Sequence, residues 1–207
     1  MLKIGVLVSG GGTNLQALID ACEVDGFPAE IVAVVSSRSK AYAVERAKRH
    51  RISHKIILKK NYTEVGAYEA EIIGYFNELG VELVVTAGFL TILDEGFSDY
   101  YANRMINIHP SLVPSFCGKG FYGLHVHEAV LASGVKITGA TVQFAVAEAD
   151  AGPIISQKAV EVMDDDTPET LQRRVMEEAE WKLLPQAVKL FAENKIIVEN
   201  NKARILK

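Results

Sequence analysis

Residues 2–22 read LKIGVLVSGGGTNLQALIDAC, and this stretch decides the fold. The short, mostly apolar run at 2–8 predicts a buried strand. Three glycines at 10–12 predict a tight turn, and the apolar side chains that follow have the 3.6-residue spacing of a helix; they are Leu15, Leu18, Ile19 and Cys22. The stretch therefore predicts a strand, a glycine turn and a helix, which is the opening of a βαβ unit.

The same alternation continues along the chain. We expect further strands at 30–35, 55–58, 83–87 and 104–108, and helices at 42–51 and 62–79, the second ended by Gly80. A loop at 109–124, a short helix at 127–133, two antiparallel strands at 138–146 and 154–162, and a helix at 167–194 then follow. The pattern predicts a Rossmann-like, three-layer αβα fold of the α/β class with a mostly parallel central sheet.

Length and composition indicate one domain over residues 1–207, with parts of about 1–100 and 101–207. The net charge of −4 argues against a nucleic-acid partner. Basic residues gather only at 46–51, in a predicted helix, and the simplest interpretation is a solvated helix face. Two cysteines are too few for a disulfide framework, and no apolar stretch is long enough for a membrane, so we expect a cytoplasmic protein.

The glycine turn predicts a phosphate site, because bare backbone and free amides at a helix N-terminus can hold an anion. A dinucleotide fingerprint would need glycine where Leu15 stands and an acidic residue after the second strand, where Ser36, Ser37 and Arg38 occur. NAD is therefore disfavoured, while Arg38 leaves an NADP site as the weaker alternative. The loop lacks the Lys-Ser or Lys-Thr ending of a P-loop.

Asn107 and His109 stand two residues apart at the end of a predicted strand, and so on the same face. Asp150 begins a tight turn that can return to the histidine. An amide donor and an acid-base group suit acyl transfer to an amine, which passes through a tetrahedral oxyanion. Asp150 would favour the charged imidazole and raise the pKa of His109. Each residue alone has an equally good structural explanation.

Two other chemistries are weaker. A metal site of His109, His125 and His127 lacks a fourth ligand and a familiar spacing, so we predict no metal. Cys117 lies in a glycine-rich loop, but nothing near it in sequence would lower its pKa, which favours a bystander thiol.

Five motifs occur in the order typical of one family. They are SGGGTN at 9–14, AGFL at 87–90, NIHPSL at 107–112, GLHVH at 123–127 and DAGPI at 150–154. The chain closely resembles the folate-dependent phosphoribosylglycinamide formyltransferases (glycinamide ribonucleotide transformylases). Methionyl-tRNA formyltransferase and formyltetrahydrofolate deformylase share the Asn, His and Asp, but carry an extra C-terminal or N-terminal domain for which this chain has no residues.

The resemblance implies transfer of the formyl group of 10-formyltetrahydrofolate to the amine of 5'-phosphoribosylglycinamide, without a metal. It implies that His109 donates a proton, that Asn107 binds the formyl oxygen, and that Asp150 supports His109 and orders a water. The resemblance also supplies binding residues: Gly12, Thr13 and Asn14 for the phosphate, Glu180 for the ribose, and Leu90, Thr91, Ile92, Leu93 and Asn107 for the folate. It places the phosphate site in the part at 1–100, and the catalytic residues and folate pocket in the part at 101–207.

Some features depart from the family or stay open. Val65 and Thr91 stand where family members carry arginine, and Ala151 replaces a common glycine, which is tolerable if its φ is negative. The segment 115–123 is either a mobile lid or a surface loop. The alternatives to formyl transfer are a hydrolase of the same folate, and a nucleotide-binding module or NADP reductase. We expect small-molecule partners only, and a monomer or homodimer.

Overall fold

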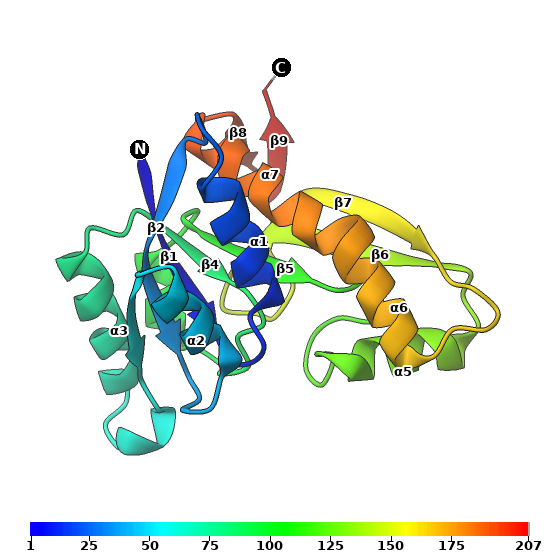
Figure 1. Ribbon diagram of the computed structural model, residues 1–207, viewed down its shortest axis with the longest axis horizontal. Coiled ribbons are helices and arrows are strands. Elements are labelled where there is room, and N and C mark those ends of the chain that lie inside the picture. The colour runs from blue at the N-terminus through cyan, green and yellow to red at the C-terminus, as the bar shows by residue number, and fades with distance from the viewer. Residues whose placement is uncertain (207) are drawn as a thin grey trace. The chain divides into compact units, whose positions relative to one another are not determined.

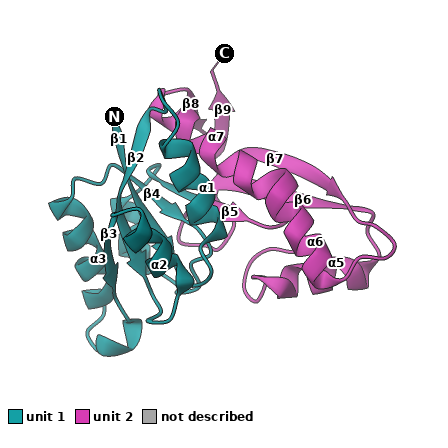
Figure 2. Cartoon of the chain, viewed as in Figure 1, with its two compact units in different colours: residues 1–106 teal, residues 107–207 magenta. Residues whose placement is uncertain are grey.

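The computed structural model describes residues 1–206 and contains a seven-stranded sheet with the strand order β3-β2-β1-β4-β5-β6-β7. The chain divides into two compact units, residues 1–106 and 107–207, and strand β5 (Met105–His109) contains the boundary (Figure 2). The expected α/β class with a mostly parallel central sheet is confirmed. The single domain stays a prediction.

The first unit is a parallel α/β arrangement (Figure 1). Its elements are β1 (Leu2–Val8), α1 (Thr13–Cys22), β2 (Ala29–Ser36), α2 (Tyr42–Arg49), β3 (Ser53–Ile56), the 3₁₀ turn η1 (Lys59–Asn61), α3 (Ala67–Glu78), β4 (Leu83–Thr86) and α4 (Glu95–Tyr100). The last five residues of β1 and all of β4 are buried, as expected for strands covered on both faces.

The strand order reverses beside β1. Strands β2 and β4 both pair with β1 in parallel, and β3 extends the sheet beyond β2. The chain thus runs outward through β2 and β3 and then returns to the other side of β1. In open α/β sheets, ligands bind beyond the carboxyl ends of the strands at such a reversal. The segments that follow β1 and β4 therefore form a candidate binding edge.

The second unit contains two antiparallel strand pairs and four helical segments within the described residues. Its elements after β5 are α5 (Leu124–Ser133), β6 (Ile137–Phe144), β7 (Ile154–Glu161), α6 (Pro168–Val175), the π-helical segment η2 (Met176–Glu180), α7 (Trp181–Ala192), β8 (Ile196–Glu199) and β9 (Lys202–Ile205). Strands β6 and β7 pair antiparallel, as predicted. Thr167 caps α6 through the amide of Thr170, with Pro168 in the first turn.

Two helix predictions need correction. The helix expected at 62–79 begins only at Ala67, because Gly66 at its N-cap has a φ of 78° and the preceding residues form a turn. Gly80 does follow the helix, with a φ of 69°. The helix expected at 167–194 is interrupted by the π-helical segment. Pro185 lies one turn beyond that segment and has no N–H for the carbonyl of Trp181, so the regular hydrogen-bond ladder cannot continue there.

Helix α4 and the hairpin β8–β9 were not predicted. Helix α4 is short but has a clear cap, because the Asp94 carboxylate accepts a 2.8 Å hydrogen bond from the Phe97 amide. The hairpin β8–β9 turns through Asn200 and Asn201, both with positive φ. Its strands have only four residues each, which is too short for a clear alternation. No helix within residues 1–206 is long and apolar enough to cross a membrane.

Candidate active site

Asn107, His109 and Asp150 come together in the second unit. Asn107 and His109 lie on the same face of β5, and Asp150 lies on the turn between β6 and β7. The Asn107 Nδ2 donates to Asp150 Oδ1 at 3.2 Å, and His109 Nδ1 lies 3.5 Å from Asp150 Oδ2. The His109 and Asp150 side chains are 6% and 11% exposed. The structure therefore assembles the three residues that sequence spacing singled out.

Two more groups hold the Asp150 carboxylate. Gln143 Nε2, near the end of β6, donates to Oδ1 at 3.0 Å, and the Gly118 amide donates to Oδ2 at 2.8 Å. Gln143 is 1% exposed. Sequence reasoning missed it, although a glutamine buried in a strand usually has a polar partner in the core. With the Asn107 amide, three N–H donors fix the position of one carboxylate.

The turn that carries Asp150 has an unusual backbone. Asp150 has a φ of 57°, in the left-handed region, which aspartate adopts more readily than most residues. Ala151 is not among the residues with positive φ, so its methyl group in place of glycine causes no strain of this kind. Gly152 is required, because a Cβ there would clash with the carbonyl oxygen of Phe144. The turn geometry is thus specified at Gly152 and aims Asp150 at the histidine.

The second ring nitrogen of His109 contacts the glycine-rich loop. His109 Nε2 lies 2.9 Å from the carbonyl oxygen of Phe116, so Nε2 must carry a proton there. Both ring nitrogens face oxygen acceptors, which suits an imidazole protonated on both. Burial and the Asp150 charge raise the pKa of Cys117, which disfavours the thiolate and supports the interpretation of a bystander.

The two neighbouring histidines differ in environment. His127 on α5 is fully buried, and burial together with the charge of His109 lowers its pKa to about 4, so it is neutral at physiological pH. His125 is exposed, and its Nδ1 lies 3.0 Å from Glu128 Oε2. Among residues 1–206, no three His, Cys, Asp or Glu side chains are grouped so that they could hold a metal ion.

The glycine turn lies at the binding edge of the first unit. Gly12 forms the N-cap of α1 with a φ of 71°, and a Cβ there would lie 2.6 Å from Ala43 Cβ. Gly10 and Gly11 do not have a positive φ, and a Cβ added at either residue would meet nothing within 4 Å. Their bare backbone is therefore open to an approaching ligand. No acidic residue lies in the first turn of α1 to offset the positive end of the helix dipole.

The segment 90–93 follows β4 and is tied to the glycine turn. The Leu90 amide donates to Ser9 Oγ at 2.9 Å, and Lys59 Nζ donates to the Ile92 carbonyl oxygen at 2.7 Å. Leu90 and Ile92 are large apolar side chains that are 40% and 75% exposed. The segment therefore presents apolar surface on a fixed backbone, and it belongs to the first unit, not to the part of about 101–207 where we placed the folate pocket.

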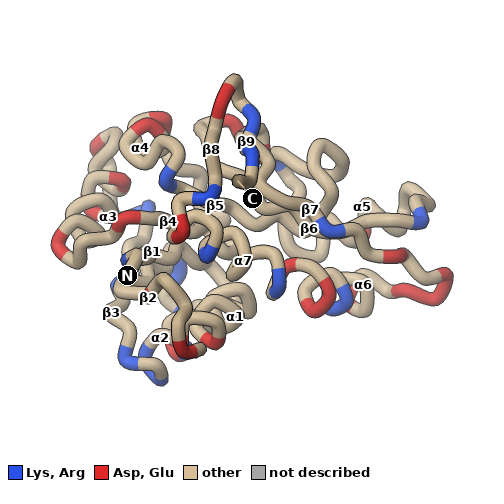
Figure 3. The backbone as a smooth tube through the Cα atoms, turned by 90° about the horizontal axis from the view of Figure 1, so that it is seen from above, with Lys and Arg blue, Asp and Glu red and all other residues tan. Residues whose placement is uncertain are grey.

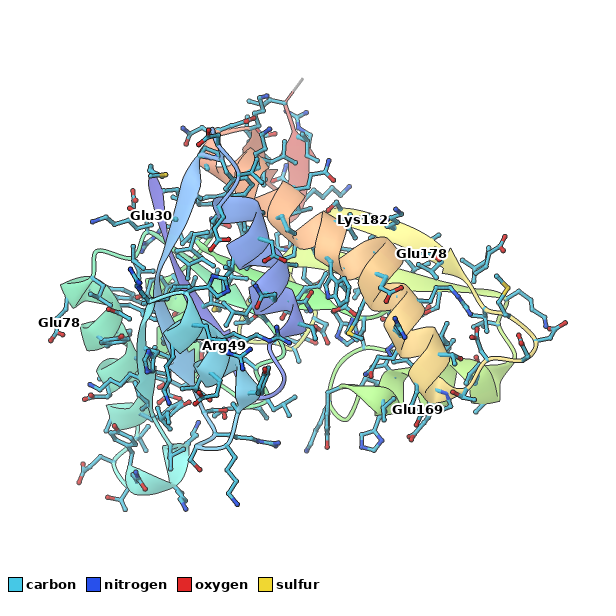
Figure 4. All side chains as sticks on the ribbon, in the orientation of Figure 1. Glu30, Arg49, Glu78, Glu169, Glu178 and Lys182 are labelled. Carbon is cyan, nitrogen blue, oxygen red and sulfur yellow. The ribbon has the colours of Figure 1, made fainter. Side chains whose placement is uncertain are left out.

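Glu180 ends the π-helical segment of the second unit and is 6% exposed. Segments of this type often occur at functional sites, because the extra residue in the turn redirects side chains. Figure 4 labels Glu178 on the same segment. Charges of both signs are interspersed along the chain in Figure 3.

Comparisons with known proteins agree with this geometry. A family model described as formyl transferase matches residues 2–188. The phosphoribosylglycinamide formyltransferase of Haemophilus influenzae is 36% identical over 203 residues, which are 98% of this chain and 93% of that protein. The trifunctional purine biosynthetic protein adenosine-3 of Gallus gallus is 41% identical over 95% of this chain, which spans 19% of that longer protein.

One solved structure is very similar. The crystal structure of glycinamide ribonucleotide transformylase 1 from Symbiobacterium toebii gives a TM-score of 0.93 at 40% identity, and the match covers 100% of this chain and 95% of that one. A match of this extent includes both units, with the glycine turn as well as the Asp150 cluster.

Proposed function

This chain belongs to the formyl transferase family, and we propose that it transfers the formyl group of 10-formyltetrahydrofolate to the amine of 5'-phosphoribosylglycinamide. The products are formylglycinamide ribonucleotide and tetrahydrofolate, in a step of de novo purine (IMP) biosynthesis. The observation that carries the proposal is the convergence of Asn107 and His109 on Asp150, because an amide donor and an imidazole beside a carboxylate are what formyl transfer requires.

The reaction needs a place for negative charge and a path for one proton. The amine nitrogen attacks the formyl carbon, the carbonyl oxygen becomes an oxyanion, and the bond from carbon to N10 of the folate then breaks. The amine loses one proton and N10 gains one, so the overall reaction consumes none. We assign Asn107 Nδ2 and His109 as the groups that stabilise the oxyanion, which is typically the largest contribution to such catalysis.

The two contacts of His109 indicate which nitrogen acts. The Nε2 contact of 2.9 Å to Phe116 O is a normal hydrogen bond, whereas the Nδ1 contact of 3.5 Å to Asp150 is at the outer limit. The Nδ1 proton is therefore less engaged, and we assign it as the proton donor to the formyl oxygen. In this assignment Asp150 stabilises the positive imidazolium by its charge and orders a water, while the loop carbonyl fixes the ring.

Binding of the ribonucleotide is assigned to backbone and to one carboxylate. We propose that the N–H groups of Gly12, Thr13 and Asn14 bind the phosphate at the start of α1, where the helix dipole favours an anion. We propose that Glu180 accepts hydrogen bonds from the ribose hydroxyls.

Binding of the folate is assigned to the segment at 90–93 and to Asn107. The exposed Leu90 and Ile92 side chains offer apolar surface for the pterin ring, and the backbone of Thr91 and Leu93 offers hydrogen bonds for its edge. Val65, fully exposed, and Thr91 carry no charge for the glutamate tail of the folate. We further propose a cytoplasmic enzyme, a monomer or homodimer, that needs no metal.

The test is a spectroscopic assay of tetrahydrofolate release from 10-formyltetrahydrofolate, run with and without the ribonucleotide, with formate measured in parallel. Release that requires the ribonucleotide and produces no formate supports the proposed transfer. Formate release without the ribonucleotide would instead identify a hydrolase, and absence of any turnover would favour a nucleotide-binding module.

A further inference from the structure

Arg46 of helix α2 reaches the glycine turn. Its Nε donates to the Gly11 carbonyl oxygen at 2.9 Å, and its Nη1 donates to Gln16 Oε1 on α1, also at 2.9 Å. The solvated helix face expected for the basic residues at 46–51 is therefore wrong for Arg46, which is only partly exposed. Arg46 bridges the turn and the first two helices.

These contacts determine which way the turn's peptides point. In a trans peptide, the C=O of one residue and the N–H of the next point in opposite directions. The Gly10 carbonyl accepts from the Ala43 amide at 3.1 Å, and the Gly11 carbonyl accepts from Arg46. Both carbonyls thus face α2, and the N–H groups of Gly11 and Gly12 point away from α2, toward the open side of the turn.

The Gly11–Gly12 peptide needs such a restraint. Glycine on both sides leaves this peptide with little steric resistance to rotation, and a rotated peptide would present a carbonyl oxygen in place of an N–H. A carbonyl oxygen repels an anion. The Gly10–Gly11 peptide is held by a backbone amide, but the Gly11–Gly12 peptide is held by the Arg46 side chain.

We propose that Arg46 is a positioning residue for the substrate phosphate, which locks the Gly11–Gly12 peptide with its N–H toward the anion and adds a positive charge beside it. This inference rests on the proposed function and deepens it. Both hydrogen-bond acceptors of Arg46 are uncharged, so its positive charge is not neutralised by these contacts and acts on the phosphate.

The guanidinium is itself held in place. Arg46 lies over the Tyr42 ring, 5.0 Å from its centroid. Gln16, which accepts from Arg46, in turn donates to Asp20 Oδ1 at 2.8 Å and lies 3.3 Å from His50 Nε2. These contacts reduce the conformational freedom that Arg46 would lose when the phosphate binds, so the charge is already in position.

The chain offers a matched control. Arg49 is three residues further along α2, where Figure 4 labels it, and it lies 5.5 Å from the centroid of the same Tyr42 ring. Within residues 1–206, it makes no hydrogen bond to the glycine turn. Arg46→Ala and Arg49→Ala therefore remove the same charge and the same ring contact, and only the first releases the Gly11–Gly12 peptide.

The experiment measures KM for each substrate and kcat in the wild type, Arg46→Ala, Arg49→Ala and Arg46→Lys. We expect Arg46→Ala to raise KM for the ribonucleotide about tenfold, as for loss of a hydrogen bond to a charged group, with KM for the folate and kcat within about twofold. Arg49→Ala should match the wild type, and Arg46→Lys should lie between.

The outcomes separate this inference from the proposed function. A wild type without ribonucleotide-dependent turnover contradicts the proposed function. A wild type that turns over, with an unchanged KM in Arg46→Ala or an equal rise in Arg49→Ala, overturns the role of Arg46. If Arg46→Ala does not fold, Gln16→Ala loosens the guanidinium without removing it. It should raise the same KM by a smaller factor, and an unchanged KM there would also overturn the inference.

Discussion

The glycine turn and the Asp150 cluster are two sites built on opposite principles. The turn acts through backbone: six consecutive residues, 9–14, supply its groups, and what matters is the absence of side chains at Gly10 and Gly11. The cluster acts through side chains that lie far apart in sequence, with Asn107 and Asp150 separated by 43 residues. Function of the glycine turn should therefore be impaired by substitutions that add side-chain atoms. Function of the Asp150 cluster should be impaired by substitutions that remove them.

The largest expected effect is at the cluster. His109→Ala removes the proton donor and should lower kcat by about 100- to 10,000-fold, with a melting temperature close to that of the wild type. Steady-state kinetics and thermal unfolding measure both. The control is His125→Ala, an exposed histidine paired with Glu128, which should keep its activity. Comparable losses in the two variants would remove the special role of His109.

The second effect tests whether the cluster extends to Gln143. Gln143→Leu removes one donor to Asp150 and should lower kcat about tenfold or more, because hydrogen bonds to charged groups contribute about 1.5–3 kcal/mol. The pH profile of kcat should shift as well, which a purely structural role would not cause. Gln157→Leu, on the paired strand β7, loses contacts to Val113 and Thr141 and serves as the control. An unshifted profile in Gln143→Leu would exclude Gln143 from the cluster.

The third effect compares two glycines of the turn: Gly10, whose Cβ position is open, and Gly12, whose backbone conformation also requires glycine. Gly10→Ala should raise KM for the ribonucleotide roughly tenfold while leaving the free energy of unfolding unchanged, since its Cβ meets nothing within the protein. Gly12→Ala should in addition lower the free energy of unfolding by about 1–2 kcal/mol, because an L-residue is strained at a φ of 71°. Urea denaturation compares the two. Equal stabilities would contradict the assignment.

The smallest effect lies outside both sites and tests stability alone. The Arg174 guanidinium, 2.6 Å from Asp166, lowers the pKa of that carboxyl to about 2. Since this pKa is below the unfolded value of about 3.9, the stabilisation is full above pH 4 and is lost as the pH falls toward 2. Asp166→Asn should cost about 1–2 kcal/mol at pH 7, measured by denaturation, and little at pH 2, with kcat unchanged. A cost independent of pH would refute the ion pair's contribution.

The sequence predicted the two sites to different degrees. The glycine turn could be predicted because its residues are contiguous and follow a buried strand. Asn107 and His109 were readable from their spacing of two, but their approach to Asp150 depends on the β6–β7 pairing and on a left-handed φ at Asp150, which no local pattern specifies. Arg46 and Gln143 were missed for the same reason, because their partners lie 35 and 7 residues away.

Element boundaries failed where tertiary packing overrides local preference. The π-helical segment at Met176–Glu180 sits inside a stretch with ordinary helical spacing, and only the later Pro185 hints at a disturbed ladder. Helix α3 begins at Ala67 and not at residue 62, because the backbone at Gly66 adopts a positive φ. The helical spacing of apolar residues across 62–79 does not reveal this conformation. The buried strands of the first unit, by contrast, follow directly from short apolar runs.

We propose that the backbone of the glycine turn binds the ribonucleotide and that the side chains of the Asp150 cluster carry out the chemistry. The most direct test is calorimetric titration of the ribonucleotide into the wild type, His109→Ala and Gly10→Ala, with turnover measured on the same preparations. We predict that His109→Ala binds the ribonucleotide as tightly as the wild type but transfers the formyl group far more slowly. Gly10→Ala should bind the ribonucleotide roughly tenfold more weakly than the wild type. If His109→Ala lost ribonucleotide binding to the same extent as Gly10→Ala, binding by backbone and chemistry by side chains would not be separate functions.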